Sequence, residues 1–251
     1  MKSVCRQLLV PVLLLALYLW ACRMEMVNPY LLPRPKQLSD SVFRLLSGGE
    51  LCEHIRISLF RVFCGFSITM VLAFPLALLF HFAPRVRDFL EASLHFLKSV
   101  PPLAMVPLFI LWFGIGEASK LALIVAASFF PLFLNIESGL QQVDDRLVEM
   151  GRSLDLEKRA LFFHIYLAES LPTILTGMRL SFGYSWRALI GAEMIAASSG
   201  LGYLILDAQE MARTGDLFVG LACIGGLGLF LDSLALRSVR RFFPWIGAEN
   251  S

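Results

Sequence analysis

Charged residues are scarce in this chain of 251 residues: Asp, Glu, Lys and Arg together make up 17%, and the formal net charge is only +2. Such a small excess of positive charge gives no basis for nucleic-acid binding. Hydrophobic residues make up 57% of the chain, above the roughly 45–50% that soluble domains contain. They fall in blocks of about 20 residues, the length at which a helix crosses a hydrocarbon core. The sequence therefore predicts an integral membrane protein.

Cysteine and histidine are also few and scattered. The five cysteines form no C-x-x-C pair, so neither a disulfide framework nor a zinc site is expected. The four histidines are isolated, and the phosphate-binding pattern G-x-x-x-x-G-K-[ST] is missing. Because no group of residues resembles a hydrolytic site, we expect this chain to have no catalytic residue, bound metal or bound cofactor.

Strand-type alternation of polar and apolar residues is missing as well, which favours a bundle of helices over a barrel. Six membrane-spanning helices are predicted, at residues 8–22, 57–82, 89–113, 121–136, 171–197 and 217–236. The third span contains Pro101, Pro102 and Pro107. Proline removes a backbone donor and clashes with the preceding turn, so we expect this span to be kinked or broken.

The first span has two interpretations. Lys2 and Arg6 precede its apolar run, as in a signal peptide, and the sequence before Cys22 faintly resembles a lipoprotein cleavage site. Trp20 is too bulky for that site, and further spans follow, so we expect an uncleaved first helix. A membrane-anchored assembly factor or lipoprotein, cleaved before Cys22, is the alternative.

Basic residues gather in alternate connections between the predicted spans. Arg85 and Arg87 follow the second span, residues 143–172 hold four basic residues, and the stretch after residue 236 holds three. The connections between them contain Lys120 and Arg213. Since Lys and Arg are enriched in cytoplasmic loops, both termini and residues 143–172 are predicted to be cytoplasmic.

Residues 143–172 read as a charged, helix-forming loop between two apolar spans. Asp144 favours a helix N-terminus, and Asp155 is predicted to cap a second helix over residues 156–168. The apolar residues on one face of the first helix are Leu147, Met150 and Leu154. The loop is either a docking surface for a soluble partner or a solvated hairpin at the membrane interface.

Five motifs stand out along the chain: PPLA at 101–104, PLFILWFGIGEASK at 107–120, FFP at 129–131, AEM at 192–194 and SSGLGYLI at 198–205. Together they resemble one known family, the membrane-spanning permeases of bacterial ATP-binding-cassette importers in the nitrate/sulfonate/taurine branch. Within residues 143–172, Glu149 matches the glutamate of the family's cytoplasmic EAA loop, Gly151 keeps its third position small, and Ile165 and Leu167 fall in register. Met150, Asp155 and Ala168 replace its usual alanine, glycine and proline.

The resemblance implies an all-α, polytopic permease of the type I importer fold, with about six transmembrane helices and a cytoplasmic coupling helix. It divides the chain into an N-terminal helix and external segment (1–52), a permease core (53–241) and a cytoplasmic tail (242–251). By position, the coupling residues are Glu149, Met150, Gly151, Arg152, Ser153, Leu154 and Asp155.

The resemblance also implies the partners and the solute. Two copies of the permease would sit in the bacterial inner membrane and bind cytoplasmic ATPase subunits, which hold ATP and magnesium. A periplasmic binding protein would deliver a small solute, such as taurine, an alkanesulfonate or a nitrate-like anion, for import by alternating access.

Charges inside the predicted spans suggest further sites, because a charge near the bilayer centre costs about 2.5–3.5 kcal/mol on insertion scales. The predicted translocation pathway comprises Arg187, Glu193 and Trp186, and the predicted outer gate comprises Ser198, Ser199, Gly200 and Gly202. A structural ion pair between Arg187 and Glu193 is the alternative. Arg61 and Lys98 are expected to extend toward the membrane surface.

A stand-alone, ion-coupled secondary carrier is the alternative function. It would use Arg187 and Glu193 as its coupled pair and would contain internal repeats, and the sequence shows none. It also leaves residues 143–172 without a role.

Overall fold

The computed structural model describes residues 13, 16–24, 28 and 31–243. The predicted tail at 242–251 lies largely outside these residues, whereas residues 16–22 of the predicted first span at 8–22 are described and helical. Within the described residues all regular structure is helical, and no strand occurs. The all-α class is therefore confirmed.

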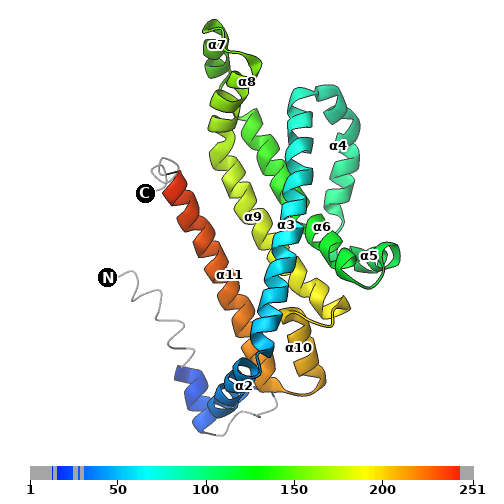
Figure 1. The fold of residues 1–251 in the computed structure, drawn as a ribbon, viewed down its shortest axis with the longest axis vertical. Coiled ribbons are helices and arrows are strands. Elements are labelled where there is room, and N and C mark those ends of the chain that lie inside the picture. The colour runs from blue at the N-terminus through cyan, green and yellow to red at the C-terminus, as the bar shows by residue number, and fades with distance from the viewer. Residues whose placement is uncertain (1–12, 14–15, 25–27, 29–30, 244–251) are drawn as a thin grey trace.

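Residues 16–23 are helical. The helices that follow, in chain order, are α2 (Pro35–Ser47), α3 (Glu50–Phe82), α4 (Pro84–Ser99), a 3-10 turn (Pro102–Met105), α5 (Val106–Phe113), α6 (Glu117–Gln141), α7 (Asp145–Ser153), α8 (Lys158–Leu161), a π turn (Phe162–Tyr166), α9 (Leu167–Ala196), α10 (Leu201–Glu210) and α11 (Thr214–Phe242). Figure 1 shows a long bundle with α7 at one end and α2 and α10 at the other. We call the end with α2 and α10 the outer end, because the topology predicted from the sequence places it outside the cytoplasm.

Five of the six predicted spans have counterparts in the described part of the chain. Helices α3, α6 and α11 are each long and apolar enough to cross a membrane. Two bent pairs make up the others: α4 and Pro102–Phe113 turn by 90°, and Lys158–Ala196 and α10 turn by 44°. The 90° bend falls at Pro101 and Pro102, so the predicted break at the prolines is confirmed.

The centre of the bundle is α6, which packs along α9 on one side and α3 on the other. Small residues bring these helices close together. A Cβ atom at Gly177 of α9 would lie only 2.3 Å from Cβ of Asn135 of α6, and one at Gly65 of α3 would lie 2.6 Å from Cγ2 of Ile124. Small residues at such positions allow close packing of helices in a bilayer, where water supplies no hydrophobic driving force between them.

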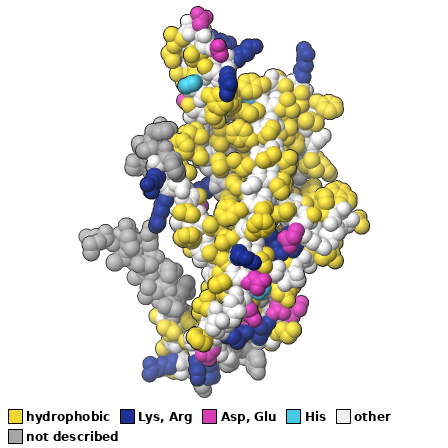
Figure 2. Space-filling model, in the orientation of Figure 1, with side chains coloured by type: hydrophobic (Ala, Val, Ile, Leu, Met, Phe, Trp, Pro, Cys, Tyr) yellow, Lys and Arg dark blue, Asp and Glu magenta, His cyan; other side chains and the backbone are white. Residues whose placement is uncertain are grey.

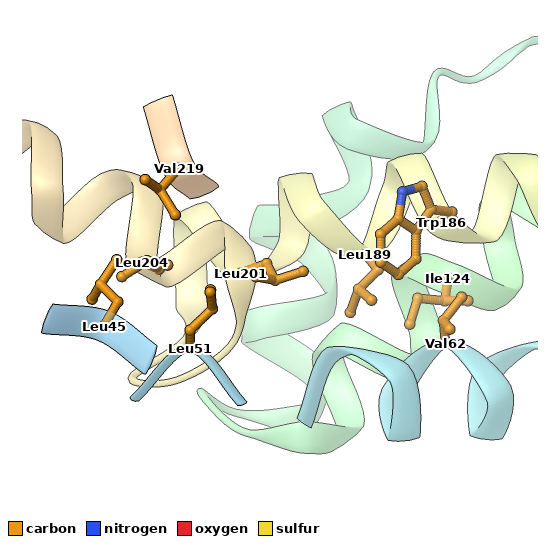
Figure 3. Close-up of a cluster of buried hydrophobic side chains, with 9 residues drawn as sticks. All are labelled: Leu45, Leu51, Val62, Ile124, Trp186, Leu189, Leu201, Leu204 and Val219. Atoms are coloured by element: carbon orange, nitrogen blue, oxygen red, sulfur yellow. The ribbon is translucent and has the colours of Figure 1, made fainter. Parts of the chain in front are cut away.

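A buried apolar cluster joins the bundle to its outer end (Figure 3). Val62, Ile124, Trp186 and Leu189 form its part between α3, α6 and α9. Its remaining members come from α2, α3, α10 and α11, and they are Leu45, Leu51, Leu201, Leu204 and Val219. The outer helices therefore share a core with the membrane-spanning ones.

Helices α2 and α10 were not predicted. Both lie between the predicted spans, where no helix was expected. The structure packs α2 against α11, where a Cβ at Gly215 would lie 2.4 Å from Oγ of Ser41. Arg44 of α2 also forms an ion pair with the buried Asp216 of α11.

The outside of the bundle suits a lipid environment. Large apolar side chains such as Val71, Leu111 and Leu229 are exposed, and Figure 2 shows an apolar surface over the middle of the molecule. On this face most acidic and basic side chains gather toward the two ends (Figure 2). Exposed apolar surface of this extent marks a membrane or protein contact.

Candidate functional site

Helix α7 stands at the end of the bundle opposite α2 and α10, and its two faces differ. Asp144 caps the helix, since its side chain accepts a hydrogen bond of 2.8 Å from the backbone amide of Arg146. The inner face packs on the following segment: Val148 is buried, and a Cβ at Gly151 would lie 2.5 Å from Cδ1 of Ile165. Only a small residue fits at position 151, so α7 packs closely against the segment that contains Ile165.

The solvent-exposed face of α7 is apolar. Met150 is 54% exposed and Leu154 is 68% exposed, while Leu147, the third residue of the predicted face, is half-buried. Glu149, Arg152 and Ser153 are exposed beside them. An amphipathic helix that presents apolar side chains to solvent, flanked by charges, is suited to insertion in a groove of another protein.

Asp155 ends α7 rather than starting the next helix, so its predicted role as an N-cap is wrong. Its φ of 53° is left-handed. The Asp155 amide donates to the carbonyl of Arg152 at 3.0 Å, and the Leu156 amide donates to the carbonyl of Gly151 at 3.1 Å. These two bonds form a Schellman motif, whose left-handed position usually holds glycine. Aspartate tolerates this left-handed angle better than most residues, though less well than glycine.

The second helix of the loop starts later than predicted. Its N-cap is Glu157, and α8 continues through the π turn directly into α9. No boundary therefore falls at Pro172, which lies inside α9.

The alternative interpretation, an ion pair between Arg187 and Glu193, is wrong. Arg187 is exposed on α9, and its guanidinium lies 5.3 Å from the ring centre of Tyr184. Glu193 is fully buried and bonds to α3 instead. Trp186 is also buried, in the cluster of Figure 3.

Glu193 belongs to a network that we call the outer charge cluster: Arg61 of α3, Glu117 and Lys120 of α6, and Glu193 of α9. Arg61 Nη1 lies 2.8 Å from Oε1 of Glu193, and its Nε and Nη2 each donate to Glu117 at 2.7 Å. Lys120 Nζ donates to the same Glu117 carboxylate at 2.7 Å. Two positive and two negative side chains therefore neutralise one another where three helices meet.

The predicted gate segment is bonded to α3 and α9. Three successive amides at the start of α10 have side-chain acceptors: Gly200 donates to His54 Nδ1 at 3.0 Å, Leu201 to Ser58 Oγ at 2.9 Å, and Gly202 to Glu193 Oε2 at 2.9 Å. Arg61 Nη1 also donates to the carbonyl of Ser199 at 2.6 Å, whereas Ser198 is exposed. These bonds satisfy helix-terminal donors that would otherwise have no partner.

Space is tight at the same corner. Gly200 has a left-handed φ of 113°, and a Cβ there would lie 2.2 Å from Oε1 of Glu193. A Cβ at Gly202 would lie 2.5 Å from the carbonyl oxygen of Ile190. The segment is therefore a close-packed corner. A side chain at either glycine would clash with its neighbours, and at Gly200 it would also face an unfavourable φ.

The residues of α3 that hold this corner were not predicted from the sequence. Arg61 was expected to reach the membrane surface, but its side chain is only 4% exposed. The available signal was a polar stripe at i, i+4 and i+7 on an otherwise apolar helix. This stripe consists of His54, Ser58 and Arg61. Among the described residues, no group of three or more His, Cys, Asp or Glu could hold a metal ion.

Comparison with known proteins identifies the family. Residues 65–246 match the family described as "Binding-protein-dependent transport system inner membrane component". The chain belongs to this family. This importer permease is 35% identical to SsuC of Bacillus subtilis, named for aliphatic sulfonate transport, over 95% of this chain and 86% of that protein. It is 31% identical to the taurine transport permease TauC of Escherichia coli, over 93% and 87%.

A solved structure supports the fold. The permease resembles a chain from an inward-facing form of the methionine ABC transporter MetNI with a TM-score of 0.64, at 15% identity, covering 73% of this chain and 92% of that one. The predicted type I importer fold and the predicted family are confirmed. As an inner-membrane transport component, the permease is not itself an enzyme.

Proposed function

We propose that this permease imports a small organic sulfonate, such as taurine or an alkanesulfonate, or a nitrate-like anion. The observation that carries the proposal is similarity over nearly the whole chain to permeases named for sulfonate and taurine transport. In the proposed cycle two copies of the permease alternate between outward and inward access. A periplasmic binding protein delivers the solute to the outer end, and both termini lie in the cytoplasm.

Helix α7 is the proposed contact with the ATPase subunits, which hold ATP and magnesium. Its exposed apolar side chains, Met150 and Leu154, are available to enter a groove. The Schellman motif at Asp155 and the close contact at Gly151 fix α7 to α9 through a short, bonded connection. A displacement of α7 by the ATPases would therefore be passed to α9. The proposed coupling residues are Glu149, Met150, Gly151, Arg152, Ser153, Leu154 and Asp155.

Arg187 is the proposed charge of the translocation pathway. It lies on an exposed face of α9 together with Leu180 and Tyr184. A charged side chain that faced lipid would cost about 2.5–3.5 kcal/mol on insertion scales, so such residues face a water-filled or protein-lined space. A second copy of the permease opposite this face would supply that space, and the cation would attract an anionic solute.

Trp186, Glu193 and the predicted gate residues take different proposed roles. Trp186 packs between helices, and Glu193 anchors the corner between α9 and α10. We propose that Ser199, Gly200 and Gly202 form a fixed corner of the outer end, while the exposed Ser198 faces the outer vestibule.

An uptake assay tests this function. The permease is expressed with an ATPase subunit and a binding protein from its source organism, in bacteria that lack their own sulfonate and nitrate importers, and uptake of radiolabelled taurine, ethanesulfonate and nitrate is measured. Uptake of at least one of these solutes that requires all three proteins is expected. Uptake of none of them, with all three proteins present, would overturn the assignment. Uptake by the permease alone, driven by an ion gradient, would establish the secondary carrier instead.

A further inference from the structure

Glu117 differs from the rest of the outer charge cluster in its exposure. Its side chain is 59% exposed, whereas those of Arg61 and Lys120 are 4% and 5% exposed. Two buried cations thus direct three N–H groups at one accessible carboxylate: Nε and Nη2 of Arg61 and Nζ of Lys120. Such a set of charged donors recognises any group that carries two or three oxygen atoms and a negative charge.

A cavity opens beside this carboxylate. Its volume is about 430 Å³, and it is lined by Arg56, Ile57, Phe60, Arg61, Glu117 and Ser199. Pockets that hold small molecules usually measure about 300–1,000 Å³. The wall combines exposed apolar surface at Phe60 with positive charge at Arg56 and Arg61. An apolar wall next to a cationic floor matches a small molecule with an alkyl part and an anionic end.

We propose that Arg61 and Lys120 form an oxyanion subsite, and that Glu117 is its internal competitor. In this account a small sulfonate enters the cavity, displaces the Glu117 carboxylate, and accepts the three hydrogen bonds that Glu117 accepted. The displaced side chain turns into solvent. The inference rests on the proposed function, since it assumes an anionic solute.

Charge balance favours an exchange of one anion for another. Arg61 and Lys120 carry two positive charges, which Glu117 and Glu193 neutralise. When Glu117 turns away, one positive charge is left uncompensated in a buried position, and burying an unpaired charge is costly. An incoming anion restores neutrality, whereas a neutral solute does not. The subsite therefore selects for charge.

Glu193 is not exchanged. It is fully buried, and it accepts hydrogen bonds from Arg61 Nη1, Ser58 Oγ and the amide of Gly202. Glu193 keeps Arg61 in position in both states, so only the accessible half of the cluster changes partner. Release of the solute follows when Glu117 returns to Arg61 and Lys120.

Equilibrium binding of radiolabelled ethanesulfonate tests the subsite. The permease is purified with its ATPase, without binding protein, and placed in lipid nanodiscs. Glu117→Gln removes the competing charge and leaves both cations, so the dissociation constant should fall about tenfold, because the binding-competent state is no longer rare. Lys120→Met should raise it about tenfold through loss of a charged hydrogen bond.

The matched control is Glu53→Gln, which removes a negative charge from an exposed residue of α3 two turns before Arg61. Its dissociation constant should stay within about twofold of wild type, since exposed charges at this distance are largely screened. A structural role for Glu117 predicts the opposite sign, weaker binding in Glu117→Gln. The subsite is overturned if Glu117→Gln binds ethanesulfonate no more tightly than wild type, or if neither wild type nor Glu117→Gln binds it.

The uptake assay separates this failure from failure of the proposed function. If the wild type imports taurine while Glu117→Gln does not tighten ethanesulfonate binding, the subsite is refuted and the function stands. If none of the three anions is imported while Glu117→Gln tightens binding, the subsite stands and the proposed solute class is refuted.

Discussion

Removing the guanidinium of Arg61 should destabilise the folded permease, because it leaves Glu193 charged and buried. Glu193 is fully buried, and Arg61 is its ion-pair partner at 2.8 Å. Breaking a buried ion pair from one side costs about 3–5 kcal/mol. At about 2–4 °C for each kcal/mol in a chain of this length, Arg61→Met should lower the Tm by roughly 6–20 °C. Thermal unfolding of the detergent-purified protein measures this shift.

A double-variant cycle tests the reasoning behind that number. Arg61→Met with Glu193→Gln removes both charges, so the double variant should lose less stability than the sum of the two single variants. Arg179→Met is the matched control. It breaks the ion pair with Asp232, in which both side chains are nearly half exposed, and exposed ion pairs contribute only about 0–1 kcal/mol. Strictly additive losses, or a loss in Arg179→Met as large as in Arg61→Met, would refute the argument.

Two further substitutions test the pathway and the corner. Arg187→Ala should lower anion uptake about tenfold or more, because a charged hydrogen-bond donor is lost. The Tm of the purified protein should change little, since the contact of Arg187 with Tyr184 is exposed and contributes about 0.5–1 kcal/mol. Loss of folded protein would instead assign Arg187 a structural role. Gly202→Ala places a Cβ 2.5 Å from the carbonyl oxygen of Ile190 and should cost about 1–3 kcal/mol by overpacking. Gly225→Ala, where a Cβ meets nothing within 4 Å, is its control in the same thermal assay, and equal stability of these two variants would contradict the close packing described for the corner.

Hydropathy was sufficient to predict the membrane-spanning helices of the described residues, since each is an apolar block bounded by charges or prolines. The break at Pro101 and Pro102 also followed from local chemistry. Helices α2 and α10 did not, because their mixed sequences become helical through burial of Leu45 and Leu204 against α11. Such amphipathic segments depend on tertiary packing more than on intrinsic propensity.

The coupling loop was predicted in part. The apolar face with Met150 and Leu154 followed from helical periodicity, and the structure exposes both side chains. The boundary at Asp155 was wrong because aspartate serves both as a helix N-cap and as a left-handed helix end. The two hydrogen bonds around Asp155, which only the structure shows, decide between these roles.

The outer charge cluster could not be assembled from the sequence. Arg61 is 132 residues from Glu193 and 56 from Glu117 along the chain, so no local pattern pairs them. The nearer candidate for Glu193 was Arg187, six residues away in the same helix, and it lies on a different face. Burial of Arg61 was also unexpected, since arginine within a span commonly reaches for the membrane surface.

The central claim is that α7 couples this permease to an ATPase, and co-purification tests it most directly. The tagged chain is purified from its native membrane in mild detergent, beside Glu149→Lys on the exposed side of α7 and Glu157→Lys, which makes the same charge change beyond α7. We expect an ATPase subunit and ATP hydrolysis with the wild type and with Glu157→Lys, and a large loss of both with Glu149→Lys. A monomer or dimer without an ATPase, or full ATPase binding by Glu149→Lys, would contradict the account.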